Sequence, residues 1–189
     1  RYGDVTDLTN FGGALIDERS FAKNVKAIER AKSAANVTIA AGGEYDDSEG
    51  YFVKPTVLLS DDPTDEAFST EYFGPILAVH VYPDDDYGRI LDVVDGGAKY
   101  GLTGAVIADD RAAVLQAEQR LRYAAGNFYV NDKPTGAVVG QQPFGGSRAS
   151  GTNDKAGSAL NLLRWTSARS IKETFVAPTD HNYPHMETR

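Results

Sequence analysis

Apolar residues near the start of the chain recur with the period of a helix. Phe21, Val25 and Ile28 follow Ser20 at this spacing, so the pattern predicts a helix with Ser20 as its N-cap. The helix is expected to end near residues 35–36. Its charged side chains are expected to face solvent: Lys23, Glu29 and Arg30.

Short apolar runs after this helix predict strands. They cover residues 37–40, 51–60 and 76–82, and the second run is bent or divided at Pro55. The acidic segment at residues 44–50 lacks the ligand spacing of an EF-hand. It is therefore expected to be a solvated turn rather than a calcium site.

Helical and strand-like segments alternate in the middle of the chain. A helical pattern over residues 86–100 is followed by a strand over 102–108, a helix capped by Asp109 and Asp110, and a strand over 127–131. This alternation is typical of βαβ units, whose parallel strands form a sheet that helices cover on both faces. The fold class is therefore predicted to be α/β, with an open, parallel-rich sheet and flanking helices.

The last of these strands opens into a long segment, residues 132–157, which is rich in glycine and has almost no helical periodicity. Loops of this length inside a domain are uncommon and are usually functional or disordered. The apolar residues Val138, Val139 and Phe144 favour a functional loop, because a solvated linker has little use for apolar anchors. Closely spaced glycines also let backbone N–H groups approach a ligand, and such groups can form an anion-binding nest.

The chain changes character after this loop. An apolar stretch at residues 160–165 gives way to a loosely alternating segment and then to a polar tail. We therefore expect a domain over residues 1–160, and an extended arm with a loose tail over residues 161–189. An arm outside the core usually packs on another subunit, so a homo-oligomer is expected.

The overall composition narrows the range of partners. Hydrophobic residues make up 41% of the chain, and 27 acidic against 19 basic residues give a net charge of −8. An acidic surface disfavours binding to nucleic acid and to anionic lipid. No apolar run approaches the roughly 20 residues that span a bilayer. The absence of cysteine excludes a thiol nucleophile and cysteine–metal sites within this chain.

The glycines do not form a recognised nucleotide-binding motif. Gly146 and Gly151 enclose four residues, but Thr152 follows where a phosphate loop requires lysine. No Gly-x-Gly-x-x-Gly stands at a strand-to-helix turn, so a Rossmann cofactor site is not expected in this chain. His80 lies in a predicted strand, where a packed structural histidine is a simpler interpretation than a metal ligand or base. No metal site is predicted.

Glu71 stands immediately before an aromatic pair and a rigid turn, with the sequence YFGP at residues 72–75. A carboxylate in this setting can accept hydrogen bonds from sugar hydroxyls while an aromatic face packs on a ring. The alternative is a surface glutamate at the end of a helix, and these residues alone leave both readings open.

Two segments resemble the aldehyde dehydrogenase superfamily. EYFGPIL at residues 71–77 resembles its Glu-x-Phe-Gly-Pro segment. Residues 126–157, followed by LLRWTS, are similar to its branch of L-glutamate γ-semialdehyde dehydrogenases, also called Δ1-pyrroline-5-carboxylate dehydrogenases. The resemblance runs through essentially the whole chain, including ALIDERSFAKNV near the start and YGLTGAV at residues 100–106.

This resemblance implies the C-terminal portion of an enzyme that oxidises glutamate γ-semialdehyde to glutamate with NAD, in proline degradation. In that family a cysteine attacks the aldehyde, hydride passes to NAD, and a glutamate serves as base. These residues and the Rossmann half precede the region that the chain resembles. No catalytic residue is therefore expected in this chain, and the chain alone is expected to be inactive.

The resemblance also implies roles for residues at matching positions. Glu71 would bond to the nicotinamide ribose, and Phe73 would pack near the nicotinamide. Gly136 and Ala137 would offer backbone N–H groups to the substrate α-carboxylate, and Phe144 would pack on its aliphatic chain. Some relatives have serine where Ala137 stands, so a hydroxyl contact is lost here while the backbone donors remain.

Two other hypotheses stay open. The chain could be a non-catalytic assembly or binding module that keeps this fold, or part of a dehydrogenase for another aldehyde such as succinate semialdehyde. The arm over residues 163–175, which begins with Leu163 and ends with Phe175, resembles the family's oligomerisation segment. A bacterial protein of this kind is expected in the cytoplasm, and a eukaryotic one in the mitochondrial matrix.

Overall fold

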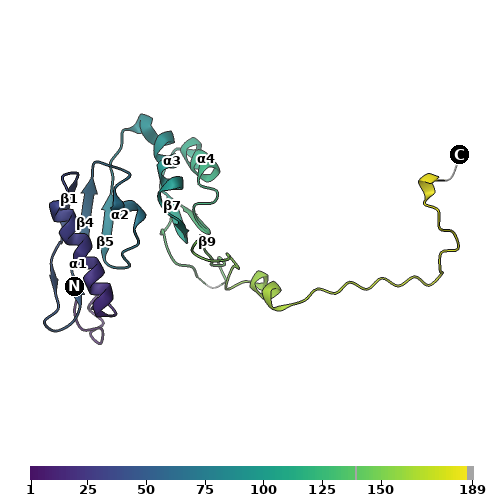
Figure 1. The fold of residues 1–189 in the computed structure, drawn as a ribbon, viewed down its shortest axis with the longest axis horizontal. Coiled ribbons are helices and arrows are strands. Elements are labelled where there is room, and N and C mark those ends of the chain that lie inside the picture. The colour runs from purple at the N-terminus through teal and green to yellow at the C-terminus, as the bar shows by residue number, and fades with distance from the viewer. Residues whose placement is uncertain (139, 187–189) are drawn as a thin grey trace.

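The structure is a computed structural model that describes residues 1–138 and 140–186. Val139, which was expected to help anchor the long loop, lies outside the described residues. Figure 1 shows two lobes, one carrying β1, β4, β5 and α1 and the other carrying α3, α4 and β7, followed by a long extended segment.

The first lobe packs a helix on a three-stranded sheet in the order β1-β4-β5. Strands β1 and β4 are antiparallel, whereas β4 and β5 run parallel, with Thr56 opposite Ile76. Buried apolar side chains of the helix and of the strands form its core, led by Ile28 and Leu58. The elements are α1 (Glu18–Ser33), β1 (Val37–Ala41), β4 (Thr56–Ser60) and β5 (Ile76–Val79).

Helix α1 begins earlier than the sequence pattern predicts. Asp17 is its N-cap, because the Asp17 carboxylate accepts the Ser20 N–H at 2.8 Å. The prediction of Ser20 as N-cap was therefore wrong. Aspartate and serine are both good capping residues, and the carboxylate three positions earlier takes the role.

Two short elements complete the first lobe. The acidic segment expected to be only a turn contains the first strand of a small hairpin, β2 (Tyr45–Asp46), which pairs antiparallel with β3 (Phe52–Val53) just after the segment. Helix α2 (Glu66–Ser69) is a single turn capped by Asp65, whose carboxylate accepts the Ala67 N–H. The chain leaves α2 directly into the turn that contains Glu71.

The second lobe contains the alternating helices and strands that the sequence predicts. Strands β7 and β8 are parallel, with Thr103 opposite Asn127, and buried Leu91 and Ala117 lie between α3 and α4. A two-stranded antiparallel sheet of β6 and β9 lies beside them. The elements are α3 (Tyr87–Gly97), β6 (Tyr100–Gly101), β7 (Thr103–Val106), α4 (Arg111–Arg120), β8 (Asn127–Val130) and β9 (Ser147–Arg148).

The α/β class is confirmed, although the parallel strands are divided between two sheets. The described residues contain the parallel pairs β4–β5 and β7–β8 but no ladder between β5 and β7. An apolar cleft of about 440 Å³ separates β5 from β7. It is lined by His80 and Tyr82, which follow β5, and by Tyr100 and Phe128 of the second lobe.

The end of the chain leaves the body of the molecule. A 3-10 helix (Ala159–Trp165) follows the long loop, and the chain then extends away from both lobes to a short turn (Pro184–Met186) (Figure 1). Trp165 and Phe175 are 81% and 90% exposed. Within the described ranges, no helix has the length and apolar character needed to cross a membrane.

Candidate functional site

The turn that follows α2 presents two of the candidate residues to solvent. Tyr72 is buried, whereas the side chains of Glu71 and Phe73 on either side of it are exposed. Phe73 has a φ of +56°, a left-handed conformation that is uncommon outside glycine, asparagine and aspartate. This backbone turn projects the Phe73 ring outward, and 78% of the residue is exposed.

Helix α1 holds this turn from beneath. The Lys23 ammonium donates to the Glu71 carbonyl and the Asn24 amide donates to the Tyr72 carbonyl, each at 3.3 Å. Asn24 is fully buried, and a Cβ placed on Gly74 would lie 2.1 Å from its Oδ1. Glycine is therefore required at position 74 for the turn to approach the helix.

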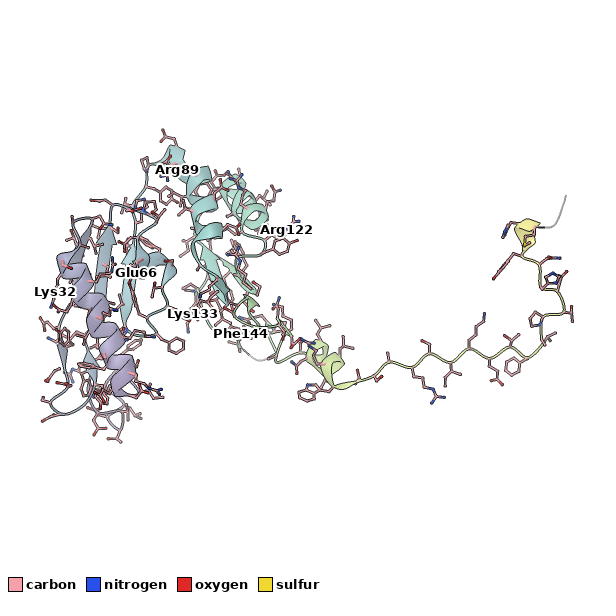
Figure 2. The ribbon with its side chains drawn as sticks, viewed as in Figure 1. Lys32, Glu66, Arg89, Arg122, Lys133 and Phe144 are labelled. Carbon is pink, nitrogen blue, oxygen red and sulfur yellow. The ribbon has the colours of Figure 1, made fainter. Side chains whose placement is uncertain are left out.

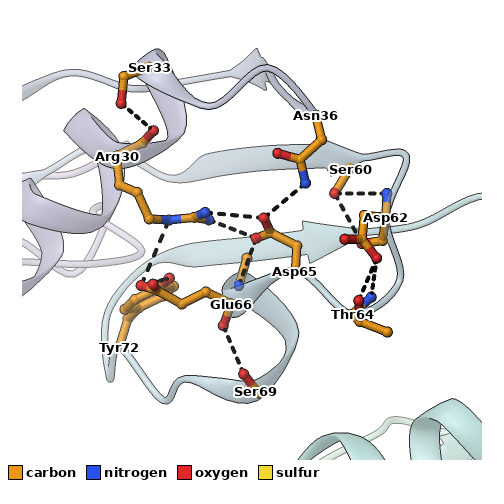
Figure 3. A network of polar contacts seen from close by, with 11 residues as sticks. Arg30, Ser33, Asn36, Ser60, Asp62, Thr64, Asp65, Glu66, Ser69 and Tyr72 are labelled. Carbon is orange, nitrogen blue, oxygen red and sulfur yellow. Dashed lines mark hydrogen bonds and ion pairs between the residues drawn. The ribbon is translucent and has the colours of Figure 1, made fainter.

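A half-buried ion pair secures the segment that leads into the turn (Figure 3). The Arg30 guanidinium donates to both carboxylate oxygens of Asp65, at 2.7 and 3.1 Å, and the Asn36 amide donates to the same carboxylate at 3.1 Å. These hydrogen bonds, led by that of Arg30, lower the pKa of Asp65 to about 2. The prediction that Arg30 faces solvent was wrong, because this pairing draws its side chain inward to 25% exposure.

The buried side of the turn is tied to α2. The Tyr72 hydroxyl donates to the Glu66 carboxylate at 3.3 Å, and burial raises the pKa of the Tyr72 phenol. The Arg30 guanidinium also lies 3.7 Å from the Glu66 carboxylate. The turn that carries Glu71 and Phe73 is therefore held in place by α1 and α2.

The long loop begins at the end of β8 and carries the other three candidates. Gly136 and Ala137 are exposed, and Gly136 has a φ of +81°, which favours glycine. Phe144 is half-buried, and its backbone exchanges two hydrogen bonds with Ala156, at 2.7 and 2.8 Å. Figure 2 shows Phe144 on the second lobe, below Lys133.

The glycines at the base of the loop allow the chain to pass closely over β8. A Cβ on Gly126 would lie 1.9 Å from the Gly145 carbonyl oxygen, so these two segments are in backbone contact. The Lys155 ammonium donates to the Gly126 carbonyl at 2.6 Å. The loop is therefore packed on the second lobe near Phe144 and Lys155, whereas Val138, one of the expected apolar anchors, is 56% exposed.

The candidate residues thus fall into two groups, one on each lobe. Glu71 lines a shallow cleft of about 480 Å³ together with Tyr100, Leu102 and Ser150 of the second lobe. Gly136 and Ala137 lie on the exposed part of the loop. Of the first group, only Glu71 lines this cleft between the two lobes.

Several supporting residues were not recognised in the sequence. Asn127 and Tyr129, on β8, hold the loop, while Asn24 and Asp65 hold the Glu71 turn. The sequence contained an indication of Asn127 and Tyr129, because two polar side chains two residues apart on a strand share one face. The second pair acts between segments far apart in sequence, which no local pattern reveals. The Nδ1 atom of His80 lies 2.9 Å from the Ser60 carbonyl oxygen, which can accept a hydrogen bond from it, consistent with a packed structural histidine.

Comparison with known proteins identifies the family. The family model described as the aldehyde dehydrogenase family matches residues 1–171. The chain belongs to the aldehyde dehydrogenase family. In the part of the chain that the structure describes, no three histidine, cysteine or acidic side chains lie close enough together to hold a metal ion.

Individual relatives carry more specific names. A probable Δ1-pyrroline-5-carboxylate dehydrogenase of Schizosaccharomyces pombe is 54% identical over 95% of this chain. The mitochondrial Δ1-pyrroline-5-carboxylate dehydrogenase of Bos taurus is 53% identical over 96% of this chain. The chain covers only 33% and 32% of these two proteins, about a third of their length.

Solved structures agree with this likeness. The crystal structure of the Δ-pyrroline-5-carboxylate dehydrogenase from Mycobacterium tuberculosis is 78% identical and superposes with a TM-score of 0.82. A second structure from that organism, bound with NAD, is 76% identical with a TM-score of 0.80. Both cover all of this chain, which in turn covers 35% and 34% of theirs.

Proposed function

We propose that this chain is part of an NAD-dependent dehydrogenase that oxidises L-glutamate γ-semialdehyde to L-glutamate during proline degradation. The observation that carries the proposal is the loop after β8, which presents Gly136 and Ala137 to solvent and is fixed to its own strand. The names of relatives at 53–54% identity support the same aldehyde.

The exposed amides suit the α-carboxylate of this substrate. Among the described residues, the N–H groups of Gly136 and Ala137 donate no hydrogen bond within the chain. Two adjacent amides at a glycine turn can bind a carboxylate without a charged side chain, because each N–H···O bond is strengthened by the charge of the acceptor. Phe144 offers an apolar ring for the three-carbon chain between the carboxylate and the aldehyde.

The Glu71 turn suits the nicotinamide end of NAD. An exposed carboxylate can accept hydrogen bonds from two ribose hydroxyls, and the outward ring of Phe73 can pack beside a planar heterocycle. The chemistry of these two groups therefore fits the cofactor. When bound, NAD would supply the hydride acceptor, and Glu71 and Phe73 would orient its nicotinamide ribose.

The nucleophile belongs to the rest of the enzyme under this proposal, since the chain contains no cysteine. Exposed apolar side chains support a larger assembly around the domain of residues 1–160. Leu77 on β5 is 60% exposed, and Ile107 after β7 is 79% exposed. We expect the remaining two-thirds of the enzyme to cover this surface, and the chain alone to be inactive.

The arm over residues 163–175 is proposed to join copies of the enzyme into a homo-oligomer. Its apolar side chains Trp165, Ile171 and Phe175 are 77–90% exposed and leave the body of the molecule (Figure 1). Burial of three such side chains in a partner would contribute roughly 1.5–3 kcal/mol each. The enzyme is proposed to act in the cytoplasm of a bacterium or in the mitochondrial matrix of a eukaryote.

Replacement of Ala137 by proline in the complete enzyme tests the carboxylate site, because proline removes one N–H. The KM for glutamate semialdehyde should rise much more than the KM for propanal, which has no carboxylate. Ala137→Gly retains the N–H and serves as the matched control. Equal rises of KM for both aldehydes would refute the role of Ala137 as a carboxylate anchor.

A further inference from the structure

Strand β8 carries two polar side chains on the same face, and both reach into the long loop. Asn127 and Tyr129 are two residues apart, which directs their side chains to one side of the sheet. The Asn127 amide lies 3.4 Å from the Tyr129 hydroxyl, so the two groups form one connected polar unit. Asn127 is 7% exposed, and Tyr129 is half-buried.

Asn127 fixes the far end of the loop. Its amide nitrogen donates to the Pro143 carbonyl at 2.9 Å, and its amide oxygen accepts the Gly145 N–H at 3.1 Å. These two backbone groups belong to the residues immediately before and after Phe144. One buried side chain therefore sets the backbone of Phe144 from both sides.

Tyr129 fixes the near end of the loop. Its hydroxyl donates a hydrogen bond to the Gly136 carbonyl. The peptide bond between Gly136 and Ala137 is trans, so the carbonyl of Gly136 and the N–H of Ala137 point in opposite directions. Holding the carbonyl against β8 therefore turns the Ala137 N–H away from the strand, toward the exposed side of the loop.

We propose that Tyr129 is a positioning residue that determines substrate specificity. Its hydroxyl orients the Ala137 N–H toward the α-carboxylate of the aldehyde. This inference rests on the proposed function of the loop. Together with Asn127, Tyr129 ties the carboxylate-binding amide and the Phe144 ring to one rigid strand. Strand β8 then fixes the distance between the Ala137 N–H and the Phe144 ring, so that aldehydes with an α-carboxylate are preferred over uncharged ones.

Tyr129→Phe in the complete enzyme tests this role, since it removes the hydroxyl and retains the ring. A single hydrogen bond of this kind is worth about a 3- to 10-fold effect. We expect kcat/KM for glutamate semialdehyde to fall by about that factor relative to kcat/KM for propanal, mainly through KM. The inhibition constant of L-glutamate, which carries the same α-carboxylate, should rise in parallel.

The matched control is Tyr123→Phe, because Tyr123 is 71% exposed and lies four residues before β8. This variant should leave the aldehyde ratio unchanged, which is kcat/KM for glutamate semialdehyde divided by kcat/KM for propanal. A melting temperature of Tyr129→Phe close to that of the unmodified enzyme would establish that the fold is retained. A purely structural role for Tyr129 would lower kcat/KM for both aldehydes equally, and that result would overturn the proposal.

A double-mutant cycle with Ala137→Pro separates this inference from the proposed function. If Tyr129 acts through the Ala137 N–H, Tyr129→Phe should change the aldehyde ratio less than about 2-fold once that N–H is gone. An undiminished effect in the Ala137→Pro background would overturn the inference and leave the carboxylate site intact. An enzyme whose aldehyde ratio does not respond to Ala137→Pro would overturn the proposed function itself.

Discussion

The Arg30–Asp65 pair beneath the Glu71 turn gives a prediction whose size follows from the structure. Asp65 is 8% exposed, and its pKa is lowered from its ordinary value of 3.8 to about 2, chiefly by hydrogen bonds from Arg30. At 1.36 kcal/mol for each unit of pKa, this lowering corresponds to about 2 kcal/mol of stabilisation at neutral pH. Asp65→Asn removes the charge, keeps the shape and should destabilise the segment by about that amount.

Hydrogen–deuterium exchange of residues 61–74 in the complete enzyme is a suitable assay, because it reports the free energy of local opening. A loss of about 2 kcal/mol should accelerate exchange in this segment by about 30-fold. The control is Asp61→Asn, since Asp61 is exposed and four positions away. Equal exchange in Asp65→Asn and Asp61→Asn would refute the claim that this ion pair holds the turn.

The stabilisation that the Arg30–Asp65 pair provides should depend on pH in one direction. Because the pKa of Asp65 is lowered in the folded state, its stabilisation is fully present above pH 3.8 and is lost as the pH falls toward about 2. The difference between the unmodified enzyme and Asp65→Asn should therefore stay constant from pH 7 to about pH 5 and decline below about pH 4. A difference that is largest at low pH would contradict this assignment.

Two glycine substitutions test the packing of the turn. Gly74→Ala should raise the KM for NAD several-fold and destabilise the turn by about 1–3 kcal/mol, because its Cβ would lie 2.1 Å from the buried Asn24 side chain. Steady-state kinetics with NAD as the varied substrate measure this effect, and an unchanged KM would argue against a cofactor role for the turn. Gly96→Ala, in contrast, has nothing within 4 Å of its Cβ and lies in α3, so calorimetry should find the melting temperature unchanged or slightly higher.

The local elements were predictable because their patterns are strong. The period of apolar residues in α1 and the alternation from α3 to β8 were confirmed, since one face of each helix is buried. The start of α1 was wrong because Asp17 competes with Ser20 for the cap. Helix ends depend on such single hydrogen bonds and are the least predictable part of an element.

The supports of the candidate site could not be predicted from local patterns. Arg30 was expected to face solvent, but Asp65, 35 residues later, pairs with it. Asn127 reaches across 16 residues to the Pro143 carbonyl. Such contacts depend on tertiary packing. Glu71, in contrast, was indicated by its neighbouring residues and by the resemblance to a family, and Ala137 by that resemblance alone.

NADH formation from pyrroline-5-carboxylate tests the proposed function most directly. Water opens the cyclic imine of this compound to glutamate γ-semialdehyde, so the complete enzyme should form NADH with a higher kcat/KM than with propanal or succinate semialdehyde. The chain alone should form none, because it contains no cysteine. NADH formation by the chain alone, or a preference of the complete enzyme for either other aldehyde, would contradict the proposed function.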